Sequence, residues 1–105
     1  MVGAPPTPSP FTVYLNTEFE QSAAALTPAE QRWALDICDA MEREGPGEKS
    51  GRLNYPKFGD VIMRRQNGVI VLFKEKAMGP RSDIAVAVGR YWRDTASGEW
   101  RTAIY

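Results

Sequence analysis

The chain has 105 residues, of which 43% are hydrophobic and 25% charged, and its formal net charge is zero. This length and composition are typical of one globular domain with a single two-layer core. The sequence contains no histidine and one cysteine, Cys38, which excludes a Cys/His zinc site and a Ser-His-Asp or Cys-His catalytic arrangement. No apolar run approaches the ~20 residues that cross a bilayer. Because a lone cysteine also suits a reducing compartment, we expect a cytoplasmic protein that uses no metal or cofactor and binds no membrane.

The zero net charge conceals two halves of opposite sign. Residues 1–44 carry seven acidic and two basic side chains, whereas residues 45–105 carry eleven basic and six acidic ones. Because the second half has the pattern of strands, one side of the molecule is expected to present a positive field that attracts phosphate backbones or acidic segments. The alternative is that two solvated surfaces of opposite charge attract each other across the fold.

A proline-rich segment precedes the domain. The first ten residues contain four prolines and are predicted to form a disordered or polyproline lead-in, residues 1–10, to a single domain over residues 11–105. The alternation from Phe11 to Leu15 then predicts a short strand.

Two capping boxes predict two consecutive helices. Thr17 and Glu20 open a helix of about ten residues. In Thr27-Pro28-Ala29-Glu30, Thr27 is the N-cap, the proline takes the first helical position and the glutamate takes the third. This second helix is expected to end before Gly45. On its apolar face, Cys38 is expected to be a core residue rather than a nucleophile. With almost no linker, the two helices should form a helical hairpin.

The remainder of the chain predicts a connection and four strands. Residues 45–59 are rich in glycine, proline and basic residues and are expected to form a long loop. The strands are expected at residues 60–65, 69–75, 83–93 and 100–105, with a tight turn at Asn67-Gly68 between the first two. The predicted fold is therefore α+β, in the order β-α-α-β-β-β-β, with the helical hairpin packed on an antiparallel meander sheet.

The third of these strands is expected to carry its larger apolar residues on one face. Alternation places Ile84, Val86 and Val88 together, opposite a face of small residues. At its end Arg90 shares a face with Trp92, and Tyr91 shares the other face with Arg93. Interleaved basic and aromatic residues can bind phosphates and stack on bases, whereas packing of Trp92 on Trp100 is the structural alternative.

The element order, with its positive charge on the sheet side, resembles the RelE/ParE toxin superfamily of bacterial toxin–antitoxin modules. FTVYLNTEFEQSAAAL resembles the family's first strand entering its first helix, and DVIMRRQNGVIVLFKE resembles its arginine-bearing strand, glycine-containing turn and returning apolar strand. The resemblance covers about residues 11–93. The family's Arg-x-Gly-x-Tyr-Arg pattern is not reproduced, because two residues separate Arg65 from Gly68, and Ile70 and Val71 stand where the tyrosine and second arginine are expected.

The resemblance implies a toxin or toxin-derived inhibitor that acts through a basic sheet surface on RNA, on the ribosome or on a protein target, with an antitoxin as partner. For the nuclease branch it implies a metal-independent endoribonuclease, in which an RNA 2′-hydroxyl attacks the adjacent phosphate. Arg64 or Arg65, together with Arg90, would stabilise the phosphoryl charge, and Tyr91 or Lys57 would transfer the proton.

Two other functions stay open. The missing second arginine and the missing histidine favour a non-catalytic protein-binding module, such as an accessory or phage-encoded factor on an α+β scaffold. The other alternative is a plain nucleic-acid-binding domain, whose affinity for nucleic acid should fall steeply with salt. An anion-binding surface requires Arg64 or Arg65 to converge with Arg90 on one exposed patch of the sheet.

Overall fold

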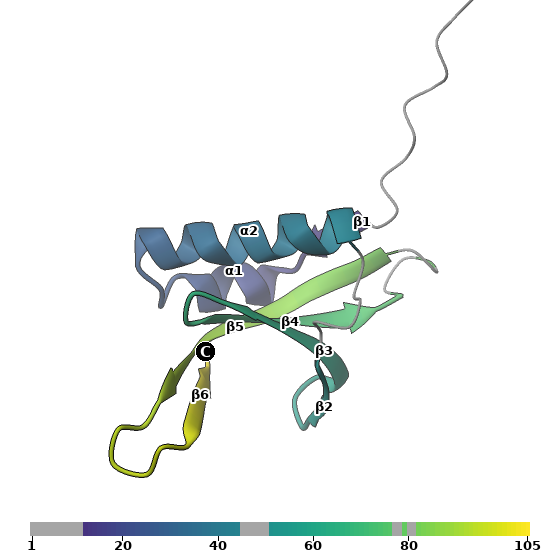
Figure 1. Ribbon diagram of the computed structural model, residues 1–105. Helices are drawn as coiled ribbons and strands as arrows, with labels where there is room; N and C mark the ends of the chain where they lie inside the picture. The colour runs from purple at the N-terminus through teal and green to yellow at the C-terminus, as the bar shows by residue number, and fades with distance from the viewer. Residues whose placement is uncertain (1–11, 45–50, 77–78, 80–81) are drawn as a thin grey trace, which may run out of the picture.

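The computed structural model describes residues 12–44, 51–76, 79 and 82–105. Two helices, α1 (Thr17–Ala23) and α2 (Pro28–Glu44), cover one face of a six-stranded sheet, as Figure 1 shows. The strands are β1 (Thr12–Leu15), β2 (Gly51–Tyr55), β3 (Gly59–Gln66), β4 (Val69–Glu75), β5 (Ser82–Arg93) and β6 (Trp100–Ile104). The predicted α+β class is confirmed. No helix in these residues combines the length and the apolar character needed to cross a membrane.

The sheet is mixed rather than antiparallel throughout. Its strand order is β1-β5-β4-β3-β2, and β6 pairs with the C-terminal half of β5. Strand β1 runs parallel to β5, whereas every other pair is antiparallel. The antiparallel meander predicted for the strands after the helices is confirmed, whereas the parallel pairing of β1 with β5 was not predicted. A parallel pair needs a long crossover, and here both helices and three strands lie between β1 and β5.

The connection predicted over residues 45–59 contains strand β2. Leu53 and Tyr55 pack against the sheet, while Arg52 and Asn54, which alternate with them, are exposed. This alternation was the missed signal, because the glycines and prolines around it indicate a loop. The order of elements therefore contains one strand more than predicted, β2. Residues 1–11 and 45–50, which include the proline-rich lead-in and Gly45, lie outside the described residues.

The helix starts follow local hydrogen bonding. At α1 the N-cap is Asn16, whose Oδ1 accepts a 2.8 Å hydrogen bond from the Thr17 amide, so Thr17 is the first helical residue and not the predicted cap. Asparagine is one of the preferred N-cap residues. At α2 the predicted capping box is confirmed. The Thr27 amide donates to Glu30 Oε1 at 2.9 Å, and the Glu30 amide donates to Thr27 Oγ1 at 3.2 Å.

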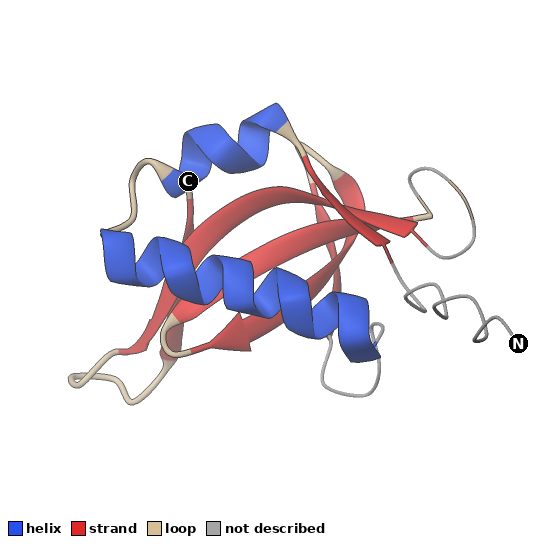
Figure 2. Cartoon of the chain, turned by 90° about the horizontal axis from the view of Figure 1, so that it is seen from above, coloured by secondary structure: helices blue, strands red, loops and turns tan. Residues whose placement is uncertain are grey.

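Apolar side chains pack on both faces of the sheet. The helix side joins the inner faces of both helices, including Cys38, to Ile62, Val71 and Phe73 of the central strands. The other face, called the open side here, carries a second cluster around Ile70 and Leu72. Figure 2 shows both helices lying over the strands on the helix side. The confirmed burial of Cys38 raises the pKa of its thiol to about 12, which makes it a core residue rather than a nucleophile.

A bulge in β5 changes which residues face the helices. The register moves from Leu72 opposite Ala87 to Phe73 opposite Ala85, so Val86 has no residue opposite it on β4. Val86 and Ile84 consequently lie on the open side, whereas Val88 joins the helix-side cluster. The predicted shared face of these three residues is wrong, because a bulge reverses the alternation beyond it.

The end of β5, beyond its last pairing with β4 at Arg90, leaves the body of the sheet and forms a projecting hairpin with β6 (Figure 1). Gly89 lies opposite Ile104 where β6 pairs with β5, and a Cβ atom at this position would overlap the carbonyl oxygen of Ala103. Only glycine permits so close an approach. The hairpin therefore extends beyond the helices, with Trp92, Arg93, Trp100 and Arg101 exposed on it.

Candidate binding surface

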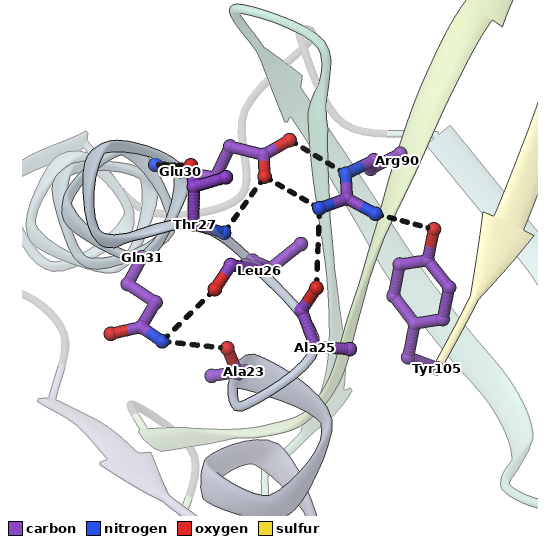
Figure 3. A network of polar contacts seen from close by, with 8 residues as sticks. All are labelled: Ala23, Ala25, Leu26, Thr27, Glu30, Gln31, Arg90 and Tyr105. Atoms are coloured by element: carbon purple, nitrogen blue, oxygen red, sulfur yellow. Dashed lines mark hydrogen bonds and ion pairs between the residues drawn. The ribbon is translucent and has the colours of Figure 1, made fainter.

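Arg90, a predicted phosphate-binding residue, is held by the helical half of the protein. Its Nε and Nη2 donate to the two carboxylate oxygens of Glu30, both at 2.7 Å. Nη2 also donates to the Ala25 carbonyl at 3.1 Å, and Nη1 donates to the Tyr105 hydroxyl at 2.9 Å (Figure 3). A guanidinium has five N–H donors. These contacts use four of them and leave little of Arg90 to bind an incoming anion.

The carboxylate of Glu30 links this network to the capping box. It accepts from Arg90 and from the Thr27 amide, and the hydrogen bonds from these two groups lower the pKa of Glu30 from 4.5 to about 2. Gln31, the next residue, donates to the carbonyl oxygens of Ala23 and Leu26 at 3.0 and 3.2 Å. The network therefore fixes the α1–α2 connection, the start of α2 and the C-terminal residue against β5 (Figure 3).

Arg64 is held at the other end of α2. Its side chain is 10% exposed, and Nη2 lies 3.2 Å from Glu44 Oε2. Helix α2 is thus joined to the sheet by an arginine–glutamate pair at each end. The acidic helices and the basic strands attract each other across the fold, which is the alternative that the charge distribution left open.

The predicted site residues do not converge. Arg64 and Arg90 lie on the helix side with glutamate partners, whereas Arg65 lies on the open side with its guanidinium 5.4 Å from the centre of the Tyr91 ring. Lys57 lies in the β2–β3 turn, 3.6 Å from a carboxylate oxygen of Glu18. Roughly 20 Å of strand β3 separates this turn from Arg65. The expectation of one exposed arginine patch is wrong, because neighbouring strand residues point to opposite faces and the helix carboxylates hold the inner ones.

Exposed aromatic and basic residues gather instead on the β5–β6 hairpin. Trp100 is 59% and Trp92 47% exposed, which makes them the most exposed large apolar side chains in the described part of the chain. The predicted packing of Trp92 on Trp100 is wrong. Trp100 packs on Tyr91, with ring centres 5.7 Å apart, and Trp92 lies opposite Arg101. Tyr91, Arg93 and Trp100 lie on one face of the hairpin, and Trp92 and Arg101 lie on the other. We call these five residues, on the two faces of the projecting hairpin, the hairpin surface.

The turn of this hairpin is fixed by hydrogen bonds to Asp94. Its Oδ1 accepts from the amides of Ala96 and Ser97 at 2.8 and 3.4 Å, and these bonds are the main reason that the pKa of Asp94 is lowered. Its Oδ2 accepts from Arg101 Nε at 3.2 Å. Arg93 Nε donates across the turn to the Gly98 carbonyl at 3.1 Å. The hairpin surface is therefore preorganised, which reduces the entropy lost on binding.

Arg101 was not among the predicted site residues, and Trp100 was expected only to pack on Trp92. Arg93 precedes and Arg101 follows the segment Asp94-Thr-Ala-Ser-Gly98, whose composition indicates a turn. Residues at equal distances from this turn lie side by side, so Arg93 pairs with Trp100, and Trp92 pairs with Arg101. This spacing was the signal that could have placed both arginines on one projecting element.

Two clefts lie elsewhere, and neither contains a catalytic arrangement. The larger has a volume of about 360 Å³, and its polar groups are paired, Arg52 with Glu75 and Asn54 with Asp60. The smaller, of about 200 Å³, lies between α1 and the β2–β3 turn and includes Lys57. Within the described ranges, no three histidine, cysteine, aspartate or glutamate side chains are grouped as metal ligands.

No family model, curated protein or solved structure matches the chain. The resemblance to the RelE/ParE superfamily therefore stays a prediction, and the function has to be argued from the geometry of the hairpin surface.

Proposed function

We propose that the protein is a non-catalytic protein-binding module of the cytoplasm, and that the hairpin surface is its contact with the partner. The observation that carries this proposal is the exposure of Trp92 and Trp100 on a projecting element whose turn is held by hydrogen bonds. Tryptophan, tyrosine and arginine contribute most of the binding free energy at protein interfaces. Rigid aromatic side chains also lose little entropy when they are covered.

The charges of the hairpin support a protein partner over a nucleic acid. Arg93 and Arg101 are balanced by Asp94 and Glu99 within the same hairpin, and the whole chain has a net charge of zero. Surfaces that bind phosphate backbones carry an excess of arginine and lysine. A balanced, aromatic surface is closer to the composition of a protein interface.

The positions of the arginines argue against the nuclease branch of the resemblance. An endoribonuclease needs a guanidinium that reaches the phosphate and a proton-transfer group beside it. Arg90 and Arg64 pair with Glu30 and Glu44, and Lys57 lies at the other end of β3 from Arg65. If the RelE/ParE relationship holds, the proposal places the chain in the branch that acts by binding.

The test is affinity capture from an extract of the source cells after RNase treatment. The wild-type chain should retain a protein that the Trp92→Ala/Trp100→Ala variant loses. Leu35→Ala is the matched control, because Leu35 is a similarly exposed apolar residue on α2 and should keep the partner. Capture that disappears with RNase or falls steeply with salt would indicate nucleic-acid binding instead.

A nuclease assay tests the same proposal from the other direction. Wild-type protein incubated with translating ribosomes should leave the mRNA intact. Cleavage that is lost in Arg65→Ala or Tyr91→Phe would contradict the proposal and restore the endoribonuclease function.

A further inference from the structure

The backbone hydrogen bonds of the hairpin leave one edge of β6 unpaired. The Asp94 amide donates to the Glu99 carbonyl at 2.8 Å, and the Tyr105 amide donates to the Val88 carbonyl at 2.9 Å. In an antiparallel pair, hydrogen-bonded and non-hydrogen-bonded residues alternate. Glu99 and Tyr105 therefore direct their backbone groups toward β5. The alternate residues between them, Arg101 and Ala103, do the same.

The residues between them direct their amides and carbonyls away from β5. They are Trp100, Thr102 and Ile104. The opposite strand confirms this alternation, because the Tyr91 amide, opposite Thr102, donates to Gly68 on the β4 side at 3.0 Å. In the described sheet β6 pairs with β5 alone. The outer edge of β6 is thus a row of backbone donors and acceptors available to another strand.

This edge has little of what normally prevents pairing between molecules. Proteins protect edge strands with proline, with charged side chains, especially lysine, or with a bulge. The one charged side chain of β6, Arg101, is paired with Asp94 of its own hairpin. The sequence of β6, WRTAI, contains neither proline nor lysine, and it pairs with β5 without a shift in register. Trp100, Arg101 and Thr102 are also exposed.

We propose that the outer edge of β6 pairs antiparallel with the β6 edge of a second copy of the chain, centred on Thr102. The inference rests on the proposal that the hairpin is a binding surface, and it names a partner for the backbone edge of that surface. In this register Trp100 lies opposite Ile104 of the second copy, and three hydrogen-bonded residue pairs supply about six backbone hydrogen bonds. The resulting dimer has a two-fold axis and one continuous sheet.

Charge and side-chain chemistry favour a second copy as the occupant. Apolar Trp100 meets apolar Ile104, and Arg101 lies opposite the small Ala103. The two copies of Arg101 approach diagonally, but each is paired with its own Asp94, at 3.2 Å in the structure. Within each projecting hairpin Arg93 and Arg101 are balanced by Asp94 and Glu99, so the two hairpins meet without an excess of like charge.

The first test is the mass of the purified full chain in solution, measured by light scattering over a series of concentrations. The wild type should show twice the mass of the chain at high concentration. Thr102→Pro should be monomeric, because proline removes an amide that points outward and breaks no bond to β5. Thr102→Val is the matched control, since it keeps the amide and should stay dimeric. A monomeric wild type, or a dimeric Thr102→Pro with an unchanged circular dichroism spectrum, would overturn the inference.

Amide hydrogen exchange of the wild type provides a test that needs no variant. The amides of Trp100, Thr102 and Ile104 should exchange at least about tenfold more slowly in concentrated than in dilute solution. Exchange that does not depend on concentration would overturn the inference.

The proposed function and the proposed dimer can fail separately. A monomer that still captures a protein through Trp92 leaves the proposed function intact, and a dimer whose Trp92→Ala/Trp100→Ala variant captures the partner normally contradicts the function alone.

Discussion

Arg90 and Trp92 are two residues apart on the same face of β5, yet their surroundings are opposite. Arg90 makes four hydrogen bonds to the helical half and the C-terminal residue, whereas Trp92 is nearly half exposed on the projecting hairpin. The difference shows that a basic residue at a strand end is not by itself a functional residue. Where β5 lies under the helices, the guanidinium of Arg90 stabilises the fold. Beyond the helices, side chains such as Trp92 are available for binding.

Replacing Arg90 tests the structural half of this comparison and should have the largest effect. Arg90→Ala leaves Glu30 without its main partner and removes the contacts to Ala25 and Tyr105. We expect the midpoint of urea denaturation to fall by roughly 1 M. Arg101→Ala on the hairpin is the control and should shift the midpoint by less than about a third of that amount, because its ion pair is exposed. Equal shifts for the two variants would contradict the distinction.

The pH dependence of stability isolates Glu30. Its pKa is about 2 in the folded protein, against 4.5 for a free glutamate side chain. The unfolded chain therefore binds this proton first, so the stabilisation is complete above about pH 4.5 and is lost as the pH falls toward 2. Glu30→Gln should reduce the loss of stability in this window, as followed by thermal unfolding. Identical pH profiles for the wild type and Glu30→Gln would mean that the Arg90–Glu30 pair does not stabilise the folded protein.

The pair at the other end of α2 should contribute less. Glu44 is 49% exposed, so its attraction to Arg64 is screened by water even though Arg64 is buried. Glu44→Ala should lower the free energy of unfolding by about 1 kcal/mol or less, measured by the same urea denaturation. A loss as large as that of Arg90→Ala would show that the two ends of the helix are anchored equally.

Features determined by neighbouring residues could be predicted from the sequence. The Thr27–Glu30 capping box formed as expected, and so did the turn at Asn67 and Gly68, whose φ values of 55° and 80° suit asparagine and glycine. The most central strand, β4, has the predicted bounds of Val69–Glu75. In each case the local pattern and the tertiary environment favour the same conformation.

Features that depend on distant residues could not be predicted in this way. The bulge at Val86 and the parallel pairing of β1 follow from how the strands meet, not from any local pattern. Glu30 and Arg90 are 60 residues apart, and only the opposite charges of the two halves hinted that such pairs would form. The candidate site was misplaced for the same reason, since the partners of Arg64 and Arg90 lie on α2.

The most direct test of the account measures stability and binding on the same pair of hairpin residues. Trp92→Ala/Trp100→Ala should unfold within about 1 kcal/mol of the wild type, because both side chains are exposed, and it should lose the protein that the wild type captures. Unchanged capture by this variant would contradict the account. So would a large loss of stability, because the two tryptophans would then be part of the core and not of a binding surface.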